Sequence, residues 1–390
     1  MTYTRREFGK LALAGLPAAA LIGKPGSLFG ALLQPKPSSL IDGVQIGTIT
    51  YSFRSMPDQS AEATLKYIVD AGISAIELMG GPVESFAGAP SSGRGGGPGG
   101  RGPGGGGRGP GGGRGDAPPA AAAAAGQETA PVGSWNGQPC PAGRGGAAGD
   151  PPAAGEGGRG RGRGEMTPEQ QAAQQEQVAK LKEWRTTVSM DAFKKLRKMY
   201  NDAGVTIYAW KQLNPNMSDE EFEYIFNVAD ALGCTHTTLE LPTDTAQLKR
   251  IGDFAMKKKI YAAYHTHLQG SMTAFDQAFA ASKGNMANID FGHYVAAGNV
   301  GGTPMEFLEK HHARIASFHL KDRTKPEHCA LNLPWGTGET PIKEILQLVK
   351  KSKWKIPASI ELEYDIPEDS DAVKEVHKCL EYCRRALAAT

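Results

Sequence analysis

Short apolar runs alternate with helical patterns along most of the chain. Eight of the runs have the length and apolar character of buried parallel strands. They lie at residues 44–51, 74–79, 205–210, 237–241, 260–265, 287–291, 315–320 and 358–364. Eight parallel strands, each followed by a helix, are the framework of a (β/α)₈ barrel.

The segments between these runs carry helix signals. Leu65 and Ile68 lie on one helical face, and Gly72 ends that pattern just before the second run. Ser218 and Glu221 form a capping box at the start of a later helix. Because this helix–Gly–strand unit repeats, we expect an α/β protein with a single (β/α)₈ TIM barrel rather than two unrelated domains.

The composition of the chain explains why it is longer than a barrel requires. The chain has 390 residues, with 51 Gly and 26 Pro, whereas a barrel needs about 250 residues. The excess of Gly and Pro falls at residues 87–165. We expect this stretch to be a long disordered Gly/Pro/Arg-rich insertion after the second strand, because it cannot bury enough apolar surface to offset its ordering entropy. The predicted division is therefore a signal and linker at 1–40, strands one and two at 41–86, the insertion at 87–165, and the remainder of the barrel at 166–390.

The N-terminus resembles a twin-arginine export signal. Arg5 and Arg6 are followed by Phe8 and Lys10, and then by an apolar run at 11–22 that is too short to span a bilayer. Signals of this kind are addresses read by an exporter rather than membrane anchors. We therefore expect a periplasmic or extracellular protein with no stable membrane span.

Cysteine usage and net charge narrow the class of protein further. Five cysteines without CxxC spacing argue against a disulfide scaffold and against a thiolate zinc site. Cys379 and Cys383 are four residues apart on an expected last helix, where we predict neighbouring free thiols at the surface. The net charge of +2 offers no basic face for nucleic acid, so no nucleic-acid partner is expected.

Side chains with metal-ligating atoms end six of the eight runs. Catalytic residues of a parallel barrel gather at the carboxyl ends of its strands. Here those positions carry Glu77, Glu240, His265, His267, Asp290, His293, His319, Lys321, Asp322, Glu361 and Glu363. Residues two apart on a strand, such as His265 and His267, point to the same side. Because imidazoles and carboxylates without thiols suit Mn²⁺, Co²⁺, Mg²⁺, Fe²⁺ or Zn²⁺, we expect one divalent metal ion at this end of the barrel.

Several of these positions carry motifs that resemble the xylose-isomerase-like barrel superfamily. Asp290 and His293 look like its strand-six Asp-x-x-His motif, and residues 265–267 are similar to the strand-five His-x-His of its dehydratase-like branch. Residues 319–322 and 336–339 resemble its strand-seven His-x-Lys-Asp motif and the loop before its last helix. The resemblance covers residues 44–86 and 189–390. It implies the chemistry of sugar isomerases, epimerases, dehydratases and keto-glycoside lyases.

The same resemblance implies a set of metal ligands. Asp290, His319 and Glu361 match ligand positions. Epimerases of the superfamily place a Glu on strand five, where this chain has His265, so the fourth ligand is either His265 or Glu240. Sequence alone favours Glu240, because carboxylate-rich sites bind Mn²⁺ or Co²⁺ without thiols.

The remaining strand-end residues are assigned to catalysis and to the substrate. Lys321 and His267, together with Glu361, are expected to transfer protons or to offset substrate charge. His293 is expected to hold a substrate hydroxyl. The other candidates for substrate binding are Glu77, Glu363 and Asp322, and Glu363 could also serve only to orient its neighbours.

The expected function is that of a metal-dependent enzyme acting on a small-molecule sugar or keto-glycoside. A metal ion polarises a carbonyl while a base removes the neighbouring proton, as in isomerisation and epimerisation. Loss of the strand-five Glu favours a lyase or dehydratase on keto-sugars or 3-keto-glycosides. Two alternatives stay open: a non-catalytic sugar-binding barrel and, least favoured, abasic-site endonuclease-like DNA repair, for which Glu77 and Lys211 replace expected histidines. An oligomer is compatible with the sequence.

Overall fold

The computed structural model describes residues 36–90, 133–140 and 167–389. Its main sheet is a closed parallel barrel with the strand order β2–β13–β10–β9–β8–β7–β6–β3, closed by pairing of β3 with β2. The barrel strands are β2 (Val44–Ile49), β3 (Ala75–Met79), β6 (Thr206–Lys211), β7 (His236–Glu240), β8 (Tyr261–His265), β9 (Asn285–Asp290), β10 (Ile315–Leu320) and β13 (Ala358–Ile360). Each predicted run overlaps one of them, so the predicted (β/α)₈ barrel is confirmed. The predicted export signal at residues 5–22 lies outside the described residues.

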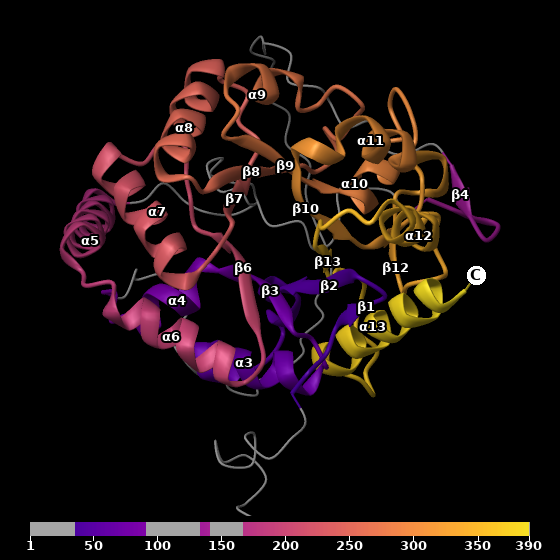
Figure 1. Ribbon diagram of the computed structural model, residues 1–390, viewed down its shortest axis with the longest axis horizontal. Coiled ribbons are helices and arrows are strands. Elements are labelled where there is room, and N and C mark those ends of the chain that lie inside the picture. The colour runs from indigo at the N-terminus through magenta and orange to yellow at the C-terminus, as the bar shows by residue number, and fades with distance from the viewer. Residues whose placement is uncertain (1–35, 91–132, 141–166, 390) are drawn as a thin grey trace, which may run out of the picture.

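Helices surround the strands (Figure 1). They are α3 (Ala61–Asp70), α4 (Gly80–Phe86), α5 (Pro168–Thr187), α6 (Asp191–Asp202), α7 (Asp219–Leu232), α8 (Thr245–Lys258), α9 (Asp276–Ala281), α10 (Phe291–Ala296), α11 (Pro304–His311), α12 (Ile342–Ser352) and α13 (Ala372–Ala388), with 3₁₀ turns η2 (Thr50–Phe53), η3 (His312–Arg314) and η4 (Pro326–His328). The predicted capping box is present, because the Ser218 hydroxyl accepts from the backbone of Glu221 at the start of α7. In the described part of the chain, no helix is both long enough and apolar enough to cross a bilayer.

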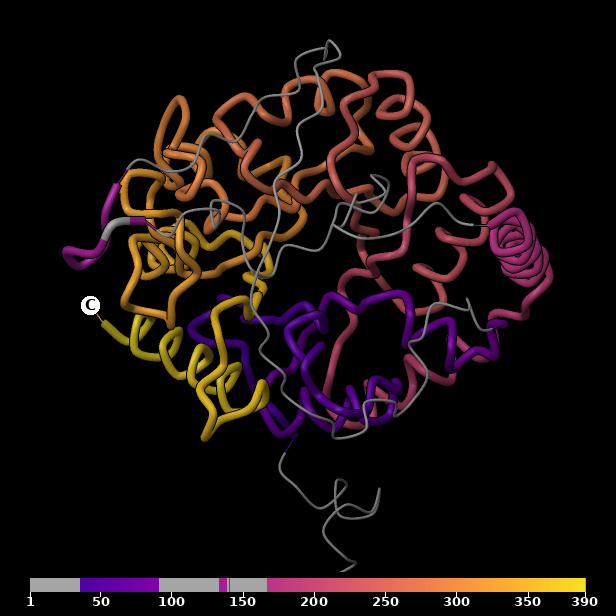
Figure 2. Tube along the Cα trace, turned by 180° about the vertical axis from the view of Figure 1, so that it is seen from behind, coloured from indigo at the N-terminus to yellow at the C-terminus, as the bar shows by residue number. Residues whose placement is uncertain are grey.

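Short strands lie outside the barrel ring. β1 (Leu40–Ile41) pairs with β2, and β11 (Asp322–Arg323) pairs with β12 (Asn332–Leu333) in the loop after β10. β4 (Ser134–Trp135) and β5 (Gln138–Pro139) form a hairpin within the predicted insertion. In Figures 1 and 2 this magenta hairpin lies beside the orange segment that follows β10.

A disulfide fixes the hairpin to the barrel. It joins Cys140 to Cys329, which follows η4, and the ring of Trp135 lies 5.5 Å from the ring of His328. The structure thus departs from the predicted disorder at residues 133–140, because the cross-link and the ring contact order a segment without a core of its own. The predicted insertion at 91–132 and 141–165 lies outside the described residues.

The cysteines differ from the prediction in two ways. The disulfide joins residues 189 apart in the sequence, a pairing that local spacing does not reveal. Cys379 and Cys383 are free, as predicted, but they are buried rather than at the surface, because α13 packs that face onto the barrel.

Helix α5 follows the predicted insertion and is anchored at its carboxyl end. Arg185 there is 9% exposed and pairs with Glu84 of α4 (2.8 Å) and Glu221 of α7 (3.1 Å). The Tyr224 hydroxyl donates to the same Glu84 carboxylate. This buried network ties the helix before the insertion to the helix after it.

Candidate active site

The carboxyl ends of the strands bring the predicted residues together. Paired residues on adjacent parallel strands point to the same face of the sheet. Glu240 pairs with His265, His265 with Asn288, and Asp290 with His319. His265, Asn288, Asp290 and His319 are each at most 1% exposed. These residues therefore line the interior of the barrel at its carboxyl end.

Four side chains form a group suited to a metal ion. One ligand atom each from His265, Asp290, His319 and Glu361 lies within 4.8 Å of the others, and all four residues are at most 5% exposed. Within the described residues, Nδ1 of His265 has no hydrogen-bond partner. Two imidazoles and two carboxylates suit a first-row divalent ion. The residues therefore fit the metal that the sequence predicts.

Glu240 lies outside this group. Its Oε1 atom is 2.8 Å from Nζ of Lys211 at the end of β6, and its Oε2 atom is 3.9 Å from Nδ1 of His267. The geometry thus favours His265 as the fourth ligand, although the sequence alone favours Glu240. The identity of that ligand stays a prediction.

His319 bridges two carboxylates. Its Nδ1 atom is 2.9 Å from Oε2 of Glu361 and its Nε2 atom is 2.7 Å from Oε2 of Glu77. Burial opposes a charge on His319, but Glu77 and Glu361 outweigh it and raise its pKa to about 10. Burial would likewise raise the pKa of Glu77, but the facing His319 lowers it to about 2. A metal ligated by His319 would therefore have to displace a proton from one ring nitrogen.

Glu77 was predicted to bind substrate, yet its contacts are all internal. Besides His319, its carboxylate accepts from the Thr238 hydroxyl (2.6 Å) and from the Asn288 amide (3.2 Å), and the residue is completely buried. These bonds hold the Glu77 carboxylate in place against His319. The contacts support a positioning role for Glu77 rather than a contact with substrate.

Lys321 places an ammonium group among the carboxylates. Its Nζ atom lies 3.2 Å from Asp290, 3.1 Å from Glu361 and 2.5 Å from Glu363. Burial opposes its charge, but these three carboxylates raise the pKa of Lys321. Burial raises the pKa of Asp290 to about 6 even though Lys321 acts in the opposite direction. Burial also opposes a negative charge on Glu361, but Lys321 and His319 lower the pKa of its carboxyl group well below the ordinary value.

His293 faces the same centre from the start of α10. Its backbone N–H donates to Oδ1 of Asp290 (2.7 Å), its Nε2 atom is 2.9 Å from Nζ of Lys321, and its Nδ1 atom is 2.6 Å from Nη1 of Arg323. Arg323 and the Lys321 ammonium can only donate, whereas a neutral imidazole has one acceptor nitrogen, so the ring accepts from one of these two cations. These contacts restrict the orientation of a ring that was predicted to hold substrate.

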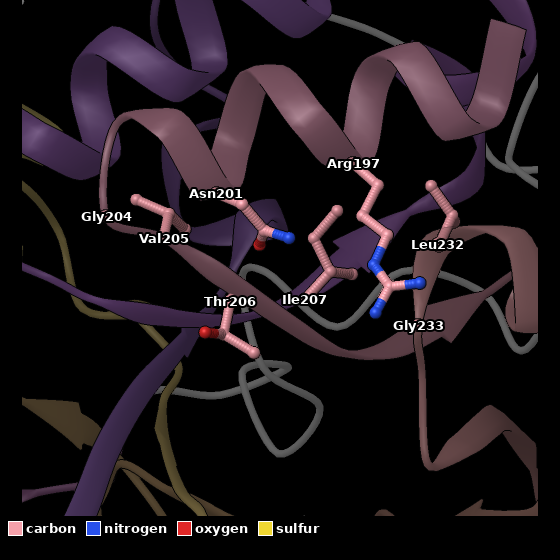
Figure 3. Close-up of a pocket in the computed structure, with 8 residues that line it drawn as sticks. All are labelled: Arg197, Asn201, Gly204, Val205, Thr206, Ile207, Leu232 and Gly233. Carbon is pink, nitrogen blue, oxygen red and sulfur yellow. The ribbon is translucent and has the colours of Figure 1, made fainter.

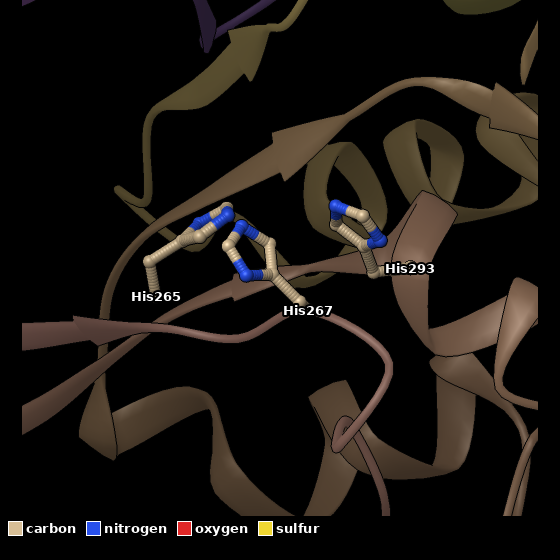
Figure 4. Close-up of side chains that lie close together, drawn as sticks. All are labelled: His265, His267 and His293. Atoms are coloured by element: carbon tan, nitrogen blue, oxygen red, sulfur yellow. The ribbon is translucent and has the colours of Figure 1, made fainter. Parts of the chain in front are cut away.

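His267 stands at the mouth of the site. Figure 4 shows its ring between those of His265 and His293, and the ring centroids are 5.0 Å and 4.8 Å away. Its side chain is 20% exposed, whereas its two neighbours are buried. Of these three imidazoles, His267 is therefore the most accessible to a ligand entering from solvent.

Asp322 and Glu363 both make contacts within the protein. The Asp322 carboxylate accepts hydrogen bonds from backbone N–H groups of the loop at residues 336–340 and so restrains that loop, while its contact with substrate stays a prediction. Glu363 is buried against Lys321, which fits the orienting role considered from the sequence.

Two further charged residues at the strand ends belong to the site. Lys211 ends β6 and pairs with Glu240, while Arg323 is fully buried and bonds to His293 and to the carbonyl of Ala330. Arg323 lies two residues after Lys321. The period-two rule that groups His265 with His267 could have identified it.

The described surface also has a cavity of about 300 Å³ that is unrelated to this site. Figure 3 shows it beneath α6, lined by Arg197, Asn201 and Thr206 among others. Thr206 begins β6, whereas Lys211 ends that strand at the site. The cavity therefore lies at the opposite end of the barrel from the metal-ligand group.

Fold and strand-end residues together define a (β/α)₈ barrel that carries, at the carboxyl ends of its strands, a group of side chains suited to a divalent metal ion. The chain belongs to the family of xylose isomerase-like TIM barrels, whose model matches residues 179–383. The family predicted from the strand-end motifs is thereby confirmed. Among curated proteins, no sequence matches this chain.

Solved structures similar to the chain include three with named activities. A sugar phosphate isomerase/epimerase from Parabacteroides distasonis is 15% identical, with 88% of this chain and 97% of that chain covered and a TM-score of 0.49. The probable 3-DHS dehydratase AsbF from Bacillus anthracis is 12% identical, with coverages of 87% and 98% and a TM-score of 0.49. A D-psicose 3-epimerase is 12% identical, with coverages of 53% and 88% and a TM-score of 0.41. At these identities and scores the neighbours carry no argument about activity.

Proposed function

We propose that this protein is a divalent-metal-dependent enzyme that removes a proton next to the carbonyl of a sugar. Within this class, the specific reaction that we propose is an elimination from a keto-sugar or 3-keto-glycoside, as in a lyase or dehydratase. The observation that carries this proposal is the buried group of His265, Asp290, His319 and Glu361, with the Lys321 ammonium beside it. Membership of the xylose isomerase-like family supports the sugar class.

The proposed chemistry divides between the ion and the side chains around it. A divalent ion held by the four-residue group would polarise the substrate carbonyl and offset the charge developing on its oxygen. Lys321 donates a hydrogen bond to the same oxygen, since its ammonium already lies among the ligand carboxylates. His267, at the solvent side, accepts the proton from carbon. In an elimination the bond to the β-substituent then breaks, and the His267 imidazolium returns that proton to the leaving oxygen.

Solvent exchange tests the proposal. With a keto-sugar in deuterated water, the carbon next to the carbonyl should acquire deuterium in substrate or product, and Glu361→Gln should suppress both exchange and turnover. His377→Ala, on the outer helix α13, is the matched control and should behave as the wild type. Intramolecular transfer of a carbon-bound deuterium without solvent label would replace proton abstraction by hydride transfer. Binding of keto-sugars without exchange or turnover would instead indicate a non-catalytic sugar-binding barrel.

We also propose that the protein is exported by the twin-arginine route. The Arg5–Arg6 pair before an apolar run supports this, as does a disulfide, which persists in oxidising compartments. Replacing Arg5 and Arg6 by Lys should retain the protein in the cytoplasm, as measured by cell fractionation. An unchanged distribution would contradict the route.

A further inference from the structure

Lys211 and Glu240 end adjacent strands at the same rim as the metal-ligand group. Lys211 pairs in register with Thr238, and Glu240 lies two residues beyond Thr238, so Lys211 and Glu240 face the same side of the sheet. Nζ of Lys211 is 2.8 Å from Oε1 of Glu240, and the two side chains are 18% and 15% exposed. They are thus more accessible from the mouth than the metal-ligand group, whose members are at most 5% exposed.

One polar atom of this pair lacks a hydrogen-bond partner. Among the described residues, Oε2 of Glu240 is a buried atom without one. The closest ring nitrogen of His267 is 3.9 Å from Oε2 of Glu240, which is too far for a hydrogen bond. Because buried polar atoms are normally paired, this oxygen is suited to accept a hydrogen bond from a hydroxyl group of a ligand.

We propose that Lys211 and Glu240 form a subsite that binds two adjacent hydroxyl groups of a neutral sugar. The ammonium of Lys211 donates to one hydroxyl oxygen, and the neighbouring hydroxyl donates to the free Oε2 of Glu240. An adjacent donor and acceptor match a vicinal diol, whose hydroxyl groups can each donate or accept. The inference rests on the proposed function for its substrate class, and it assigns Glu240 to the sugar rather than to the metal.

The charges around the pair favour a sugar without a phosphate or carboxylate group at this position. The carboxylate of Glu240 repels an anion, and it already pairs with Lys211. Three further carboxylates, those of Asp290, Glu361 and Glu363, surround Lys321 and oppose the approach of another anion. The pair thus selects a neutral polyol segment, such as the remote part of a keto-sugar or a glycoside.

The test uses metal-loaded protein and two unreactive probes. Methyl α-D-glucopyranoside carries vicinal hydroxyl groups, whereas methyl 3-deoxy-α-D-glucopyranoside carries none. Their dissociation constants are measured by ligand-observed NMR titration for the wild type, Lys211→Met and Glu240→Gln. The control is Glu223→Gln, which removes a charge from another Lys–Glu pair, that of Lys257 and Glu223 on α8 and α7 (2.6 Å).

We expect Kd for the glucoside to rise about tenfold or more in both variants, since each loses a hydrogen bond to a charged group, and to stay unchanged in Glu223→Gln. The 3-deoxy probe should bind the wild type about tenfold more weakly, and Lys211→Met and Glu240→Gln should not weaken it further. Bound metal, by elemental analysis, should be unchanged in Glu240→Gln.

Three results would overturn the subsite: no binding of the glucoside to the wild type, equal affinity of the wild type for the two probes, or unchanged glucoside binding in Lys211→Met. Loss of metal in Glu240→Gln would make Glu240 a ligand and overturn its assignment to the sugar. If the proposed function fails instead, keto-sugars show no solvent exchange while Lys211-dependent binding of the glucoside persists. The two failures are therefore distinguishable.

Discussion

A single methyl group at Gly292 would test the placement of Lys321. Gly292 lies in the first turn of α10, after its N-cap Asp290. A Cβ at this position would lie 2.3 Å from Cγ of Lys321 and 2.7 Å from the Lys321 carbonyl oxygen. Because carbon atoms normally pack at about 3.5–4.0 Å, the lysine stem would have to move by about 1 Å.

The structure gives the size and the sign of the effect. Nζ of Lys321 is within 3.2 Å of Asp290, Glu361 and Glu363, so a shift of that size breaks these contacts. A misplacement of about 1 Å lowers a rate by roughly 10²-fold, and overpacking costs about 1–3 kcal/mol of stability. Helix propensity alone predicts the opposite, since Ala is favoured over Gly by about 1 kcal/mol. A loss of stability would therefore report the clash.

The assay compares Gly292→Ala with a matched control. Gly81→Ala, in α4, is suitable because nothing lies within 4 Å of the added Cβ. Gly292→Ala should lower turnover and solvent exchange about 100-fold and lower the unfolding midpoint, by roughly 2–4 °C per kcal/mol, whereas Gly81→Ala should lower neither. Wild-type rate and midpoint in Gly292→Ala would refute both the packing and the catalytic role of Lys321.

Three further outcomes are expected. Asp290→Asn and His319→Gln should each lower bound metal at least about tenfold, as measured by elemental analysis; contents equal to that of a His377→Ala control would remove the proposed metal site. Thiol titration in denaturant should find three free cysteines before reduction, and reducing the bond between Cys140 and Cys329, 189 residues apart, should lower stability by up to about 5 kcal/mol; an unchanged unfolding midpoint would show that the hairpin is not restrained. Burial lowers the pKa of His236 from 6.5 to about 4, so only the unfolded chain binds this proton between those pH values. As the pH is lowered from 6.5 to 4, the free energy of unfolding should therefore decrease by up to about 3 kcal/mol more in the wild type than in His236→Gln. Identical pH profiles would contradict the buried neutral imidazole.

The sequence was sufficient to predict the barrel strands but not the hairpin that is attached to the barrel. The run at 315–320 coincides with β10, and the run at 260–265 differs from β8 by one residue, because buried parallel strands carry continuous apolar segments. The hairpin at 133–140 has no such pattern. Its order depends on a disulfide to Cys329 and on the Trp135 ring contact, which only the folded chain brings about.

The site was predictable as a set of residues but not as a set of contacts. Strand ends identified both His265 and Glu240, and the sequence favoured Glu240. The two residues are register neighbours, and their side-chain contacts place only His265 with the other ligands. Asp322 directly follows Lys321, so the alternation of a strand turns it the other way, towards the loop at 336–340. That alternation was available in the sequence. The pairing of Lys211 with Glu240 was not, because it depends on how two strands align.

The barrel closes between residues that are far apart in the chain. The Thr48 hydroxyl bonds to the carbonyl of Ile360, 312 residues later, and Glu77 reaches His319 across 242 residues. Such contacts become favourable only after the entropy of closing a long loop has been overcome. A nascent chain still lacking β13 has neither Glu361 nor a closed ring to hold His319 against Glu77. The proposed metal site should therefore form late and in one step, when synthesis of the last strand is complete.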